Sequence, residues 1–180
     1  MKKIVFGFAV SFLAACSEGS LNKEMAAKIL KQEKPLPDTM SFAMFTHDGA
    51  FAKRMLQYGL EERGLIRVAQ TKRTFDTTAW ITITDNGKQY LHAPSKDDRK
   101  SGIQRVKTGT RELGKVIQVD IKSDRNHAIV WYTVVYRNLT PFAVLIHKKE
   151  GQVDTVKSYM QRVGADWHID KKPDIEYLMP

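Results

Sequence analysis

The sequence has one cysteine, few glycines and prolines, and no apolar run long enough to cross a membrane. A single cysteine excludes a disulfide framework, and it excludes metal sites built from two or four cysteines. With 11 glycines and 6 prolines among 180 residues, the chain is neither collagen-like nor disordered in composition. Its 42% of hydrophobic residues is enough for a buried core in one ordinary domain or two small ones.

The first sixteen residues are organised like a secretory signal peptide. Lys2 and Lys3 form a basic start, residues 4–12 are almost entirely apolar, and small residues follow. The apolar stretch is shorter than the roughly 20 residues that a membrane-spanning helix needs. A charged start, a short apolar run and small residues near a cleavage point therefore predict a cleaved signal peptide over residues 1–15.

The end of this segment, Leu13-Ala14-Ala15-Cys16, resembles the lipobox of bacterial lipoprotein precursors. The resemblance implies cleavage before Cys16 and acylation of Cys16, which is then the lipidation site and ties the chain to a membrane. The next residue is Ser17 and not aspartate, and similarity to sorted lipoproteins then implies the periplasmic face of the outer membrane. The alternative is an ordinary secreted protein with a cysteine near its cleavage point.

Acylation at Cys16 leaves a short tether, residues 16–20, before the first predicted helix. At roughly 3.5 Å per residue the tether reaches at most about 15–20 Å, so we expect the folded part to lie close to the bilayer. The formal net charge of +9 becomes +7 once the two lysines of residues 1–15 are removed. A basic chain held near a bilayer is expected to attract anionic headgroups or another anionic component of the envelope.

Residues 21–94 are predicted to be mainly helical. Apolar residues recur at helical spacing in residues 21–32 and 51–63, and an apolar run at 40–45 predicts a short helix. Alternation at residues 80–84 predicts a strand.

Two segments of this region resemble the recognition helix and the wing of winged-helix domains, with Ile83 where leucine is usual. They are Leu60-Glu61-Glu62-Arg63-Gly64-Leu65-Ile66 and Ile83-Thr84-Asp85-Asn86-Gly87-Lys88-Gln89-Tyr90-Leu91. The resemblance covers roughly residues 22–93 and implies a winged-helix fold there. The alternative is an unrelated α+β segment with a helix and a hairpin.

The rest of the chain is predicted to form a linker followed by a sheet. Residues 95–114 carry both charge signs without apolar periodicity, which predicts a polar, basic linker. Residues 115–172 place β-branched and aromatic residues between short polar turns, which predicts antiparallel strands with one buried face. Residues 173–180 form a C-terminal tail. The predicted fold class is therefore α+β, with a winged-helix-like N-terminal half followed by a mainly antiparallel β-sheet.

Six basic side chains of the front half are candidate contacts with an anionic surface: Lys53, Arg54, Arg63, Arg67, Lys72 and Arg73. DNA binding is the usual role of the winged-helix family. However, Glu61 and Glu62 on the same predicted helix repel phosphate, and the lipobox implies a location outside the cytoplasm. We therefore expect a protein or another anionic partner instead of nucleic acid.

The sequence carries no pattern typical of catalysis or metal binding. The histidines are not spaced as metal ligands, and there is neither a Gly-x-Ser-x-Gly motif nor a glycine-rich phosphate loop. Ser20 and Lys23 match a Ser-x-x-Lys pattern, but at the tether, where no pocket can form. We therefore predict no catalytic residue, no metal ligand and no cofactor.

Aromatic residues of the last third are predicted to fill the core, with a ligand pocket as the alternative: Trp131, Tyr132, Tyr136, Phe142, Tyr159 and Trp167. Taken together, the sequence predicts a non-enzymatic envelope lipoprotein. It would bind another envelope protein or an anionic envelope component. Two alternatives stay open: an enzyme or enzyme-associated factor acting on envelope polymers, and an exclusion or immunity-type lipoprotein.

Overall fold

A computed structural model describes residues 20–73, 76–173 and 177 of the chain. The predicted signal peptide, Cys16 and most of the predicted tether and C-terminal tail lie outside these residues. Within the described ranges, no helix is both long enough and apolar enough to cross a membrane.

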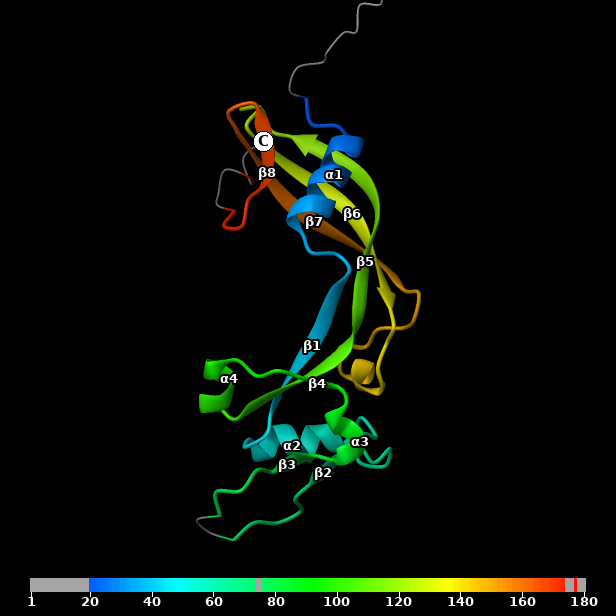
Figure 1. Ribbon diagram of the computed structural model, residues 1–180, viewed down its shortest axis with the longest axis vertical. Coiled ribbons are helices and arrows are strands. Elements are labelled where there is room, and N and C mark those ends of the chain that lie inside the picture. Colours follow the sequence, from blue (N-terminus) through cyan, green and yellow to red (C-terminus); the bar gives the residue numbers. More distant parts are fainter. Residues whose placement is uncertain (1–19, 74–75, 174–176, 178–180) are drawn as a thin grey trace, which may run out of the picture.

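The chain combines short helices with antiparallel strands, which confirms the α+β class (Figure 1). The helices are α1 (Lys23–Glu33), α2 (Gly49–Leu56), α3 (Asp85–Lys88), α4 (Lys96–Lys100) and the 3-10 helix η1 (Pro141–Ile146). The strands are β1 (Asp38–Phe45), β2 (Ile66–Val68), β3 (Ile81–Ile83), β4 (Leu91–His92), β5 (Ile103–Ile121), β6 (His127–Arg137), β7 (Val153–Val163) and β8 (Asp166–Ile169).

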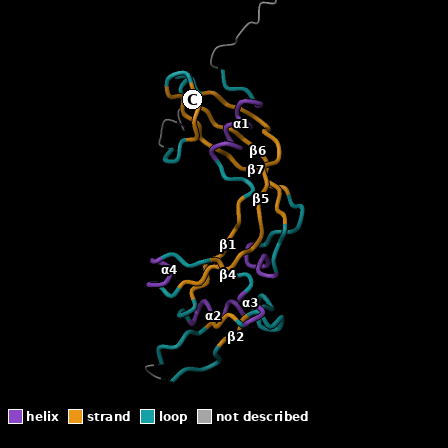
Figure 2. The backbone as a smooth tube through the Cα atoms, viewed as in Figure 1, coloured by secondary structure: helices purple, strands orange, loops and turns teal. Residues whose placement is uncertain are grey.

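The main sheet has the strand order β1-β5-β6-β7-β8, and β4 also pairs with β5. Strands β2 and β3 form a separate pair, and all of these pairings are antiparallel. The molecule is elongated; β5 runs along most of it, and β1 lies beside the part of β5 that leads from the middle toward α2 (Figures 1 and 2). Two separate apolar cores lie toward the two ends.

The first core belongs to what we call the sheet lobe, formed by α1 and the adjoining parts of β5 to β8. Asn22 caps α1, because its side chain accepts a hydrogen bond from the backbone N–H of Met25 at 2.8 Å. The inward side of α1 packs on one face of the sheet, and the buried residues of this core include Ala26, Ile29, Leu30, Val130, Tyr132, Met160 and Trp167.

The second core belongs to the small lobe, formed by α2 to α4, β2 to β4, η1 and the adjoining ends of β1 and β5. Asp48 caps α2 by accepting hydrogen bonds from the backbone N–H groups of Ala50 and Phe51. Turns over residues 57–64 lead from α2 into β2. The buried residues of this core include Met44, Phe51, Leu60, Ile66, Ile81, Val106 and Phe142.

The winged-helix part of the prediction is not confirmed. Helix α1 packs in the sheet lobe, whereas α2 and the β2–β3 pair pack in the small lobe. Residues 21–94 therefore do not share one core. Helix α2 also ends at Leu56, well before the predicted end at residue 63, and turns replace its last part.

Two further segments differ from the sequence prediction. Residues 40–45 belong to β1 and not to a helix, because pairing with β5 supplies the backbone hydrogen bonds that a six-residue helix would have to form locally. Residues 95–114 are not a linker, since they contain α4 and the first part of β5. The predicted antiparallel sheet over residues 115–172 is present, and it begins earlier, at Ile103.

Strand β5 joins the lobes through an irregularity in its pairing with β1. The register shifts between Met40 and Ser41, opposite Thr108 and Gly109. Gly109 has a φ of +153°, and a Cβ atom there would lie 2.6 Å from Leu139 Cδ2. Such a bulge bends the strand, and here it lies where β5 leaves one core for the other.

Candidate binding surfaces

Polar side chains gather where β1 and β5 pass between the lobes. We call Asp38, Arg111, Tyr136, Lys148 and Asp154 the waist cluster. Arg111 donates from Nε to Asp38 Oδ1 at 3.1 Å and from Nη2 to Asp38 Oδ2, which is a bidentate ion pair across the β1–β5 pairing. This pair raises the pKa of Arg111, and it fixes the start of β1 on the sheet.

Asp154 is the most heavily coordinated carboxylate of the waist cluster. Its Oδ2 accepts from Lys148 Nζ at 2.6 Å and from the Tyr136 hydroxyl at 2.8 Å, while Oδ1 accepts from Gln152 at 2.9 Å. These donors, the lysine first, lower the pKa of Asp154 to about 2. The same carboxylate raises the pKa of Lys148. Burial, followed by the bond to Asp154, raises the pKa of Tyr136.

Two cavities adjoin the waist cluster and share the Asp38–Arg111 pair. The one we call the waist cavity has a volume of about 380 Å³ and is also lined by Lys148, Tyr136 and Thr108. The other has about 280 Å³ and reaches Lys34. Lys34 donates to the Tyr132 hydroxyl at 2.6 Å and lies 5.0 Å from the centre of that ring.

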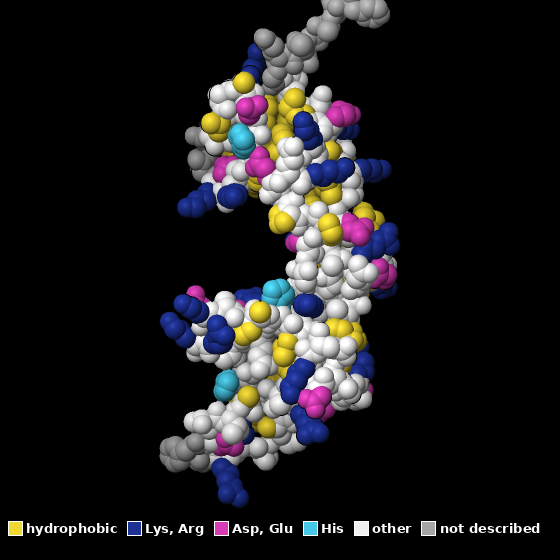
Figure 3. Space-filling model, in the orientation of Figure 1, with side chains coloured by type: hydrophobic (Ala, Val, Ile, Leu, Met, Phe, Trp, Pro, Cys, Tyr) yellow, Lys and Arg dark blue, Asp and Glu magenta, His cyan; other side chains and the backbone are white. Residues whose placement is uncertain are grey.

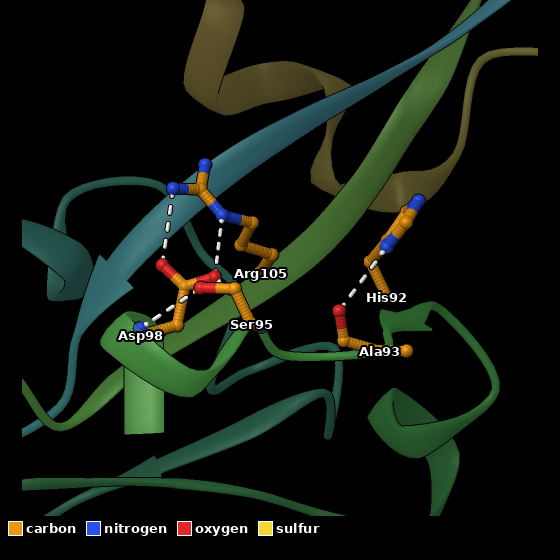
Figure 4. A network of polar contacts seen from close by, with 5 residues as sticks. All are labelled: His92, Ala93, Ser95, Asp98 and Arg105. Atoms are coloured by element: carbon orange, nitrogen blue, oxygen red, sulfur yellow. Dashed lines mark hydrogen bonds and ion pairs between the residues drawn. The ribbon is translucent and has the colours of Figure 1, made fainter. Parts of the chain in front are cut away.

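An ion pair attaches α4 to β5 in the small lobe (Figure 4). Arg105 donates from Nε and Nη2 to the two carboxylate oxygens of Asp98, both at 3.0 Å. Asp98 and Ser95 also exchange hydrogen bonds in a capping box at the start of α4. Arg105, followed by Ser95, lowers the pKa of Asp98 to about 2.

The carboxylate of Asp98 is paired with Arg105 of β5, and the cations of α4 itself lie on the surface. Lys96, Arg99 and Lys100 are exposed, and Lys and Arg side chains gather over α4 beside the hollow between the lobes (Figure 3). These three residues were missed by the sequence analysis because the segment was predicted to be a linker. The Ser95–Asp98 spacing, which is a capping-box pattern, was the signal that could have identified the helix.

Two of the six predicted basic contacts have internal structural roles. The Arg63 guanidinium donates to the backbone carbonyls of Tyr58 at 2.7 Å, Gly59 at 3.1 Å and Pro141 at 3.3 Å, which joins the turns after α2 to η1. Lys72 donates to the backbone carbonyl of Thr78 and lies 5.0 Å from the centre of the Trp80 ring. Each cation is therefore fixed by groups of the turns and loops that it stabilises.

The other four predicted contacts, Lys53, Arg54, Arg67 and Arg73, are exposed. Arg67 lines an open polar cavity of about 720 Å³ together with Glu61 and Asp85, so the charge there is mixed. All six predicted residues belong to the small-lobe half of the chain. The elements that they belong to or adjoin, α2 and β2, lie toward the end of the molecule opposite α1 (Figure 1).

The five histidines lie in separate elements or turns of the fold. Among the described residues, no group of three His, Cys, Asp or Glu side chains could hold a metal ion. His127 lies 2.5 Å from Asp124 and His168 lies 3.0 Å from Glu33. His47, His92 and His147 are exposed.

Most of the six predicted aromatic core residues are buried, namely Tyr132, Tyr136, Phe142 and Trp167. Trp131 is 36% exposed on the sheet face away from α1. There, Lys157 Nζ lies 5.9 Å from the Trp131 ring and 5.1 Å from the ring of the half-buried Tyr159.

Comparison with known proteins gives no relative for this chain: no family model, curated protein or solved structure matches it.

Proposed function

We propose that this protein is a lipid-anchored, non-enzymatic binding protein of the bacterial envelope. Its small lobe presents basic side chains to an anionic envelope component or to an acidic surface of another envelope protein. The lipobox-like Leu13-Ala14-Ala15-Cys16 supports the anchor, and Ser17 supports the periplasmic face of the outer membrane as its location. The three acyl chains expected on such a cysteine exceed the two that stable anchoring requires.

The observation that carries the proposal is that α1, which follows the predicted tether, lies at the end of the molecule opposite α2 and β2 (Figure 1). The exposed basic residues Lys53, Arg54, Arg67 and Arg73 belong to α2, β2 and the loop after β2. Strand β5 alone has 19 residues and a contour length of about 60 Å. A tether over residues 16–20 reaches only about 15–20 Å. With the sheet lobe toward the bilayer, the small lobe would therefore stand away from the headgroups.

Because of this separation, the basic charge favours a partner other than the headgroups of the protein's own membrane. Electrostatic attraction between exposed charges is largely screened beyond about 8–10 Å at physiological salt. A small lobe several tens of ångströms from the anchor would therefore gain little from the headgroups of its own membrane. We infer that its cations, including Lys96, Arg99 and Lys100 of α4, serve a protein or polymer partner instead.

In this proposal, the winged-helix resemblance applies only to the small lobe. There, α2, the β2–β3 pair and α3 follow in the order that carried the resemblance. The carboxylates Glu61 and Asp85 border the same surface as Arg67, and they would repel a nucleic-acid backbone. A mixed charge pattern fits a protein surface better than phosphate.

Site-specific photo-crosslinking in cells that carry the native anchor tests this function. A photoreactive residue at Arg54 or Arg67 is expected to give a discrete crosslinked product, and the product is expected to weaken when Lys53 and Arg73 are changed to Glu. The same residue placed at exposed Lys171, in the sheet-lobe half of the chain, is the control. Crosslinks only to lipid from Arg54 and Arg67 would contradict the proposal.

The anchor has a separate test. The Cys16→Ser variant is expected to leave the membrane fraction and to lose lipid labelling. Membrane association that persists with lipid labelling intact would show that Cys16 is not the lipidation site.

A further inference from the structure

We propose that the waist cavity is a binding site for a small oxyanion, that is, a phosphate or carboxylate group. The cavity lies between β1, β5 and the end of η1, where Ser41, Thr108, Arg111, Lys148 and Ile146 line it. It borders the sheet-lobe core through Tyr136 and Met40, and it includes none of the six basic residues predicted from the sequence. The inference therefore stands independently of the proposed small-lobe partner.

The cationic groups of the cavity have hydrogen-bond donors left over. Arg111 uses Nε and Nη2 for Asp38, and among the described residues its Nη1 group has no partner. Lys148 uses one of its three N–H groups for Asp154, and its Nζ also lies 5.1 Å from the centre of the Tyr136 ring. Both oxygens of Asp38 already accept from Arg111, so this carboxylate is neutralised within its own pair. Asp154 balances the charge of Lys148 in the same way, so the unused capacity that lines the cavity consists of N–H donors on these two paired cations.

Thr108 is the independent observation that points to a ligand. Its side chain is completely buried, and its hydroxyl has no hydrogen-bond partner among the described residues. A buried hydroxyl without a partner is destabilising and uncommon in native proteins. Thr108 lies at the bulge opposite Met40 and Ser41, where the irregular β1–β5 pairing makes room. An acceptor in the cavity would satisfy this hydroxyl.

An oxyanion is the ligand class that fits these groups together. Arginine and lysine side chains donate and cannot accept, and a guanidinium with free N–H groups matches the geometry of phosphate and carboxylate oxygens. A hydroxyl such as that of Thr108 or Ser41 can add a further donor. Met40 and Ile146 also line the cavity, and its volume of about 380 Å³ leaves room for a small organic group on the anion.

The position of the cavity favours a soluble anion over a lipid headgroup. Arg111 lies ten residues of β5 before Ile121, which is roughly 30 Å along the strand toward the end of the molecule that carries Ser20. This distance exceeds the reach of the short tether. We therefore assign the oxyanion to a soluble molecule or to the anionic end of a polymer.

Titration with inorganic phosphate at constant ionic strength tests the site, using the full chain with Cys16→Ser to keep it in solution. Amide NMR shifts are expected to saturate with a dissociation constant of millimolar order, and to be confined to residues 38–41, 108–111 and 146–148. Thr108→Val keeps the side-chain shape and removes the hydroxyl, so it is expected to fold at least as stably as the parent. It is expected to bind phosphate about ten-fold more weakly, because a bond to a charged group is lost.

Lys148→Gln is expected to weaken phosphate binding similarly, whereas Lys149→Gln, the exposed neighbour, is the matched control and should bind like the parent. Binding that is unchanged in both Thr108→Val and Lys148→Gln would overturn the site. So would shifts that never saturate, because the cavity would then hold no specific phosphate site. Vesicles of phosphatidylglycerol that compete with phosphate, when phosphatidylcholine vesicles do not, would keep the oxyanion site but overturn its assignment to a soluble ligand.

Discussion

At the scale of single residues, the waist cluster depends on carboxylates held ionised by several donors. Asp154 accepts from Lys148, Tyr136 and Gln152, and its pKa lies near 2 instead of 3.8. A carboxylate with a lowered pKa in the folded state stabilises that state fully above its ordinary pKa. The contribution is lost as the pH falls toward the folded-state value.

We therefore predict that acid sensitivity between about pH 4 and pH 2 depends on Asp154. Asp154→Asn removes the charge that Lys148 faces, and should lower the free energy of unfolding at pH 7 by about 1 kcal/mol, because the side chain is 27% exposed and solvent screens the pair. Its stability should then change less than that of the parent between pH 4 and pH 2. Urea unfolding at several pH values measures both effects.

Asp166→Asn, at an exposed position, is the control for this prediction. A parallel loss of stability in the parent and in Asp154→Asn across the same acid range would mean that other groups cause the transition.

At the scale of elements, close backbone contacts explain a residue that the sequence analysis noticed only as part of a motif. Gly87, in α3, packs against the chain just before β2, and a Cβ atom there would lie 2.2 Å from the carbonyl oxygen of Leu65. This oxygen cannot move freely, because it accepts a hydrogen bond from the backbone N–H of Thr84 at 3.1 Å. A glycine at this position therefore allows α3 to lie against β2 and β3.

We predict that Gly87→Ala destabilises the small lobe by about 1–3 kcal/mol, since the added methyl group must displace backbone. Asn86→Ala, at the adjacent exposed position, should change stability by less than about 0.5 kcal/mol. Thermal or urea unfolding of the two variants compares them directly. Equal stability of Gly87→Ala and the parent would show that α3 can shift away from β2 without loss.

The elements also show which sequence patterns were informative. Strands β6 and β7 were predicted correctly because β-branched and aromatic residues fill them, and their turns are polar. Strand β1 was predicted as a helix because a short apolar run does not distinguish a helix from a strand. The start of β5 was predicted as a linker because Arg105, Lys107 and Arg111 mask the alternation of Val106 and Thr108. Two of these cations are neutralised by partners outside the strand, Arg105 by the nearby Asp98 and Arg111 by the distant Asp38.

At the scale of the whole molecule, the two cores have no buried residue in common. They are joined by β1, β5 and the polar waist cluster, and not by apolar packing. Local unfolding usually follows such boundaries, because each core has its own cooperative contacts.

We predict that core mutations act mainly on their own lobe. Phe142→Ala in the small lobe should cost about 3–5 kcal/mol and Leu30→Ala in the sheet lobe about 2–5 kcal/mol, since both side chains are fully buried. Amide hydrogen exchange is expected to accelerate in the mutated lobe and to change less in the other. Met25→Ala, 38% exposed on α1, is the control. Equal acceleration in both lobes for each variant would show one cooperative unit.

The sequence by itself determined the features that depend on residues close together in the chain. Alternation predicted β6 and β7, composition predicted a buried core, and Leu13-Ala14-Ala15-Cys16 supplied the lipid-anchor hypothesis. The tertiary structure alone decided that α1 and α2 enter different cores, and that the predicted basic residues lie far from Ser20. It alone joined Arg111 to Asp38, 73 positions away, and left Thr108 buried beside them. Strand pairing and burial depend on which segments far apart in the sequence come into contact, and local periodicity does not specify those contacts.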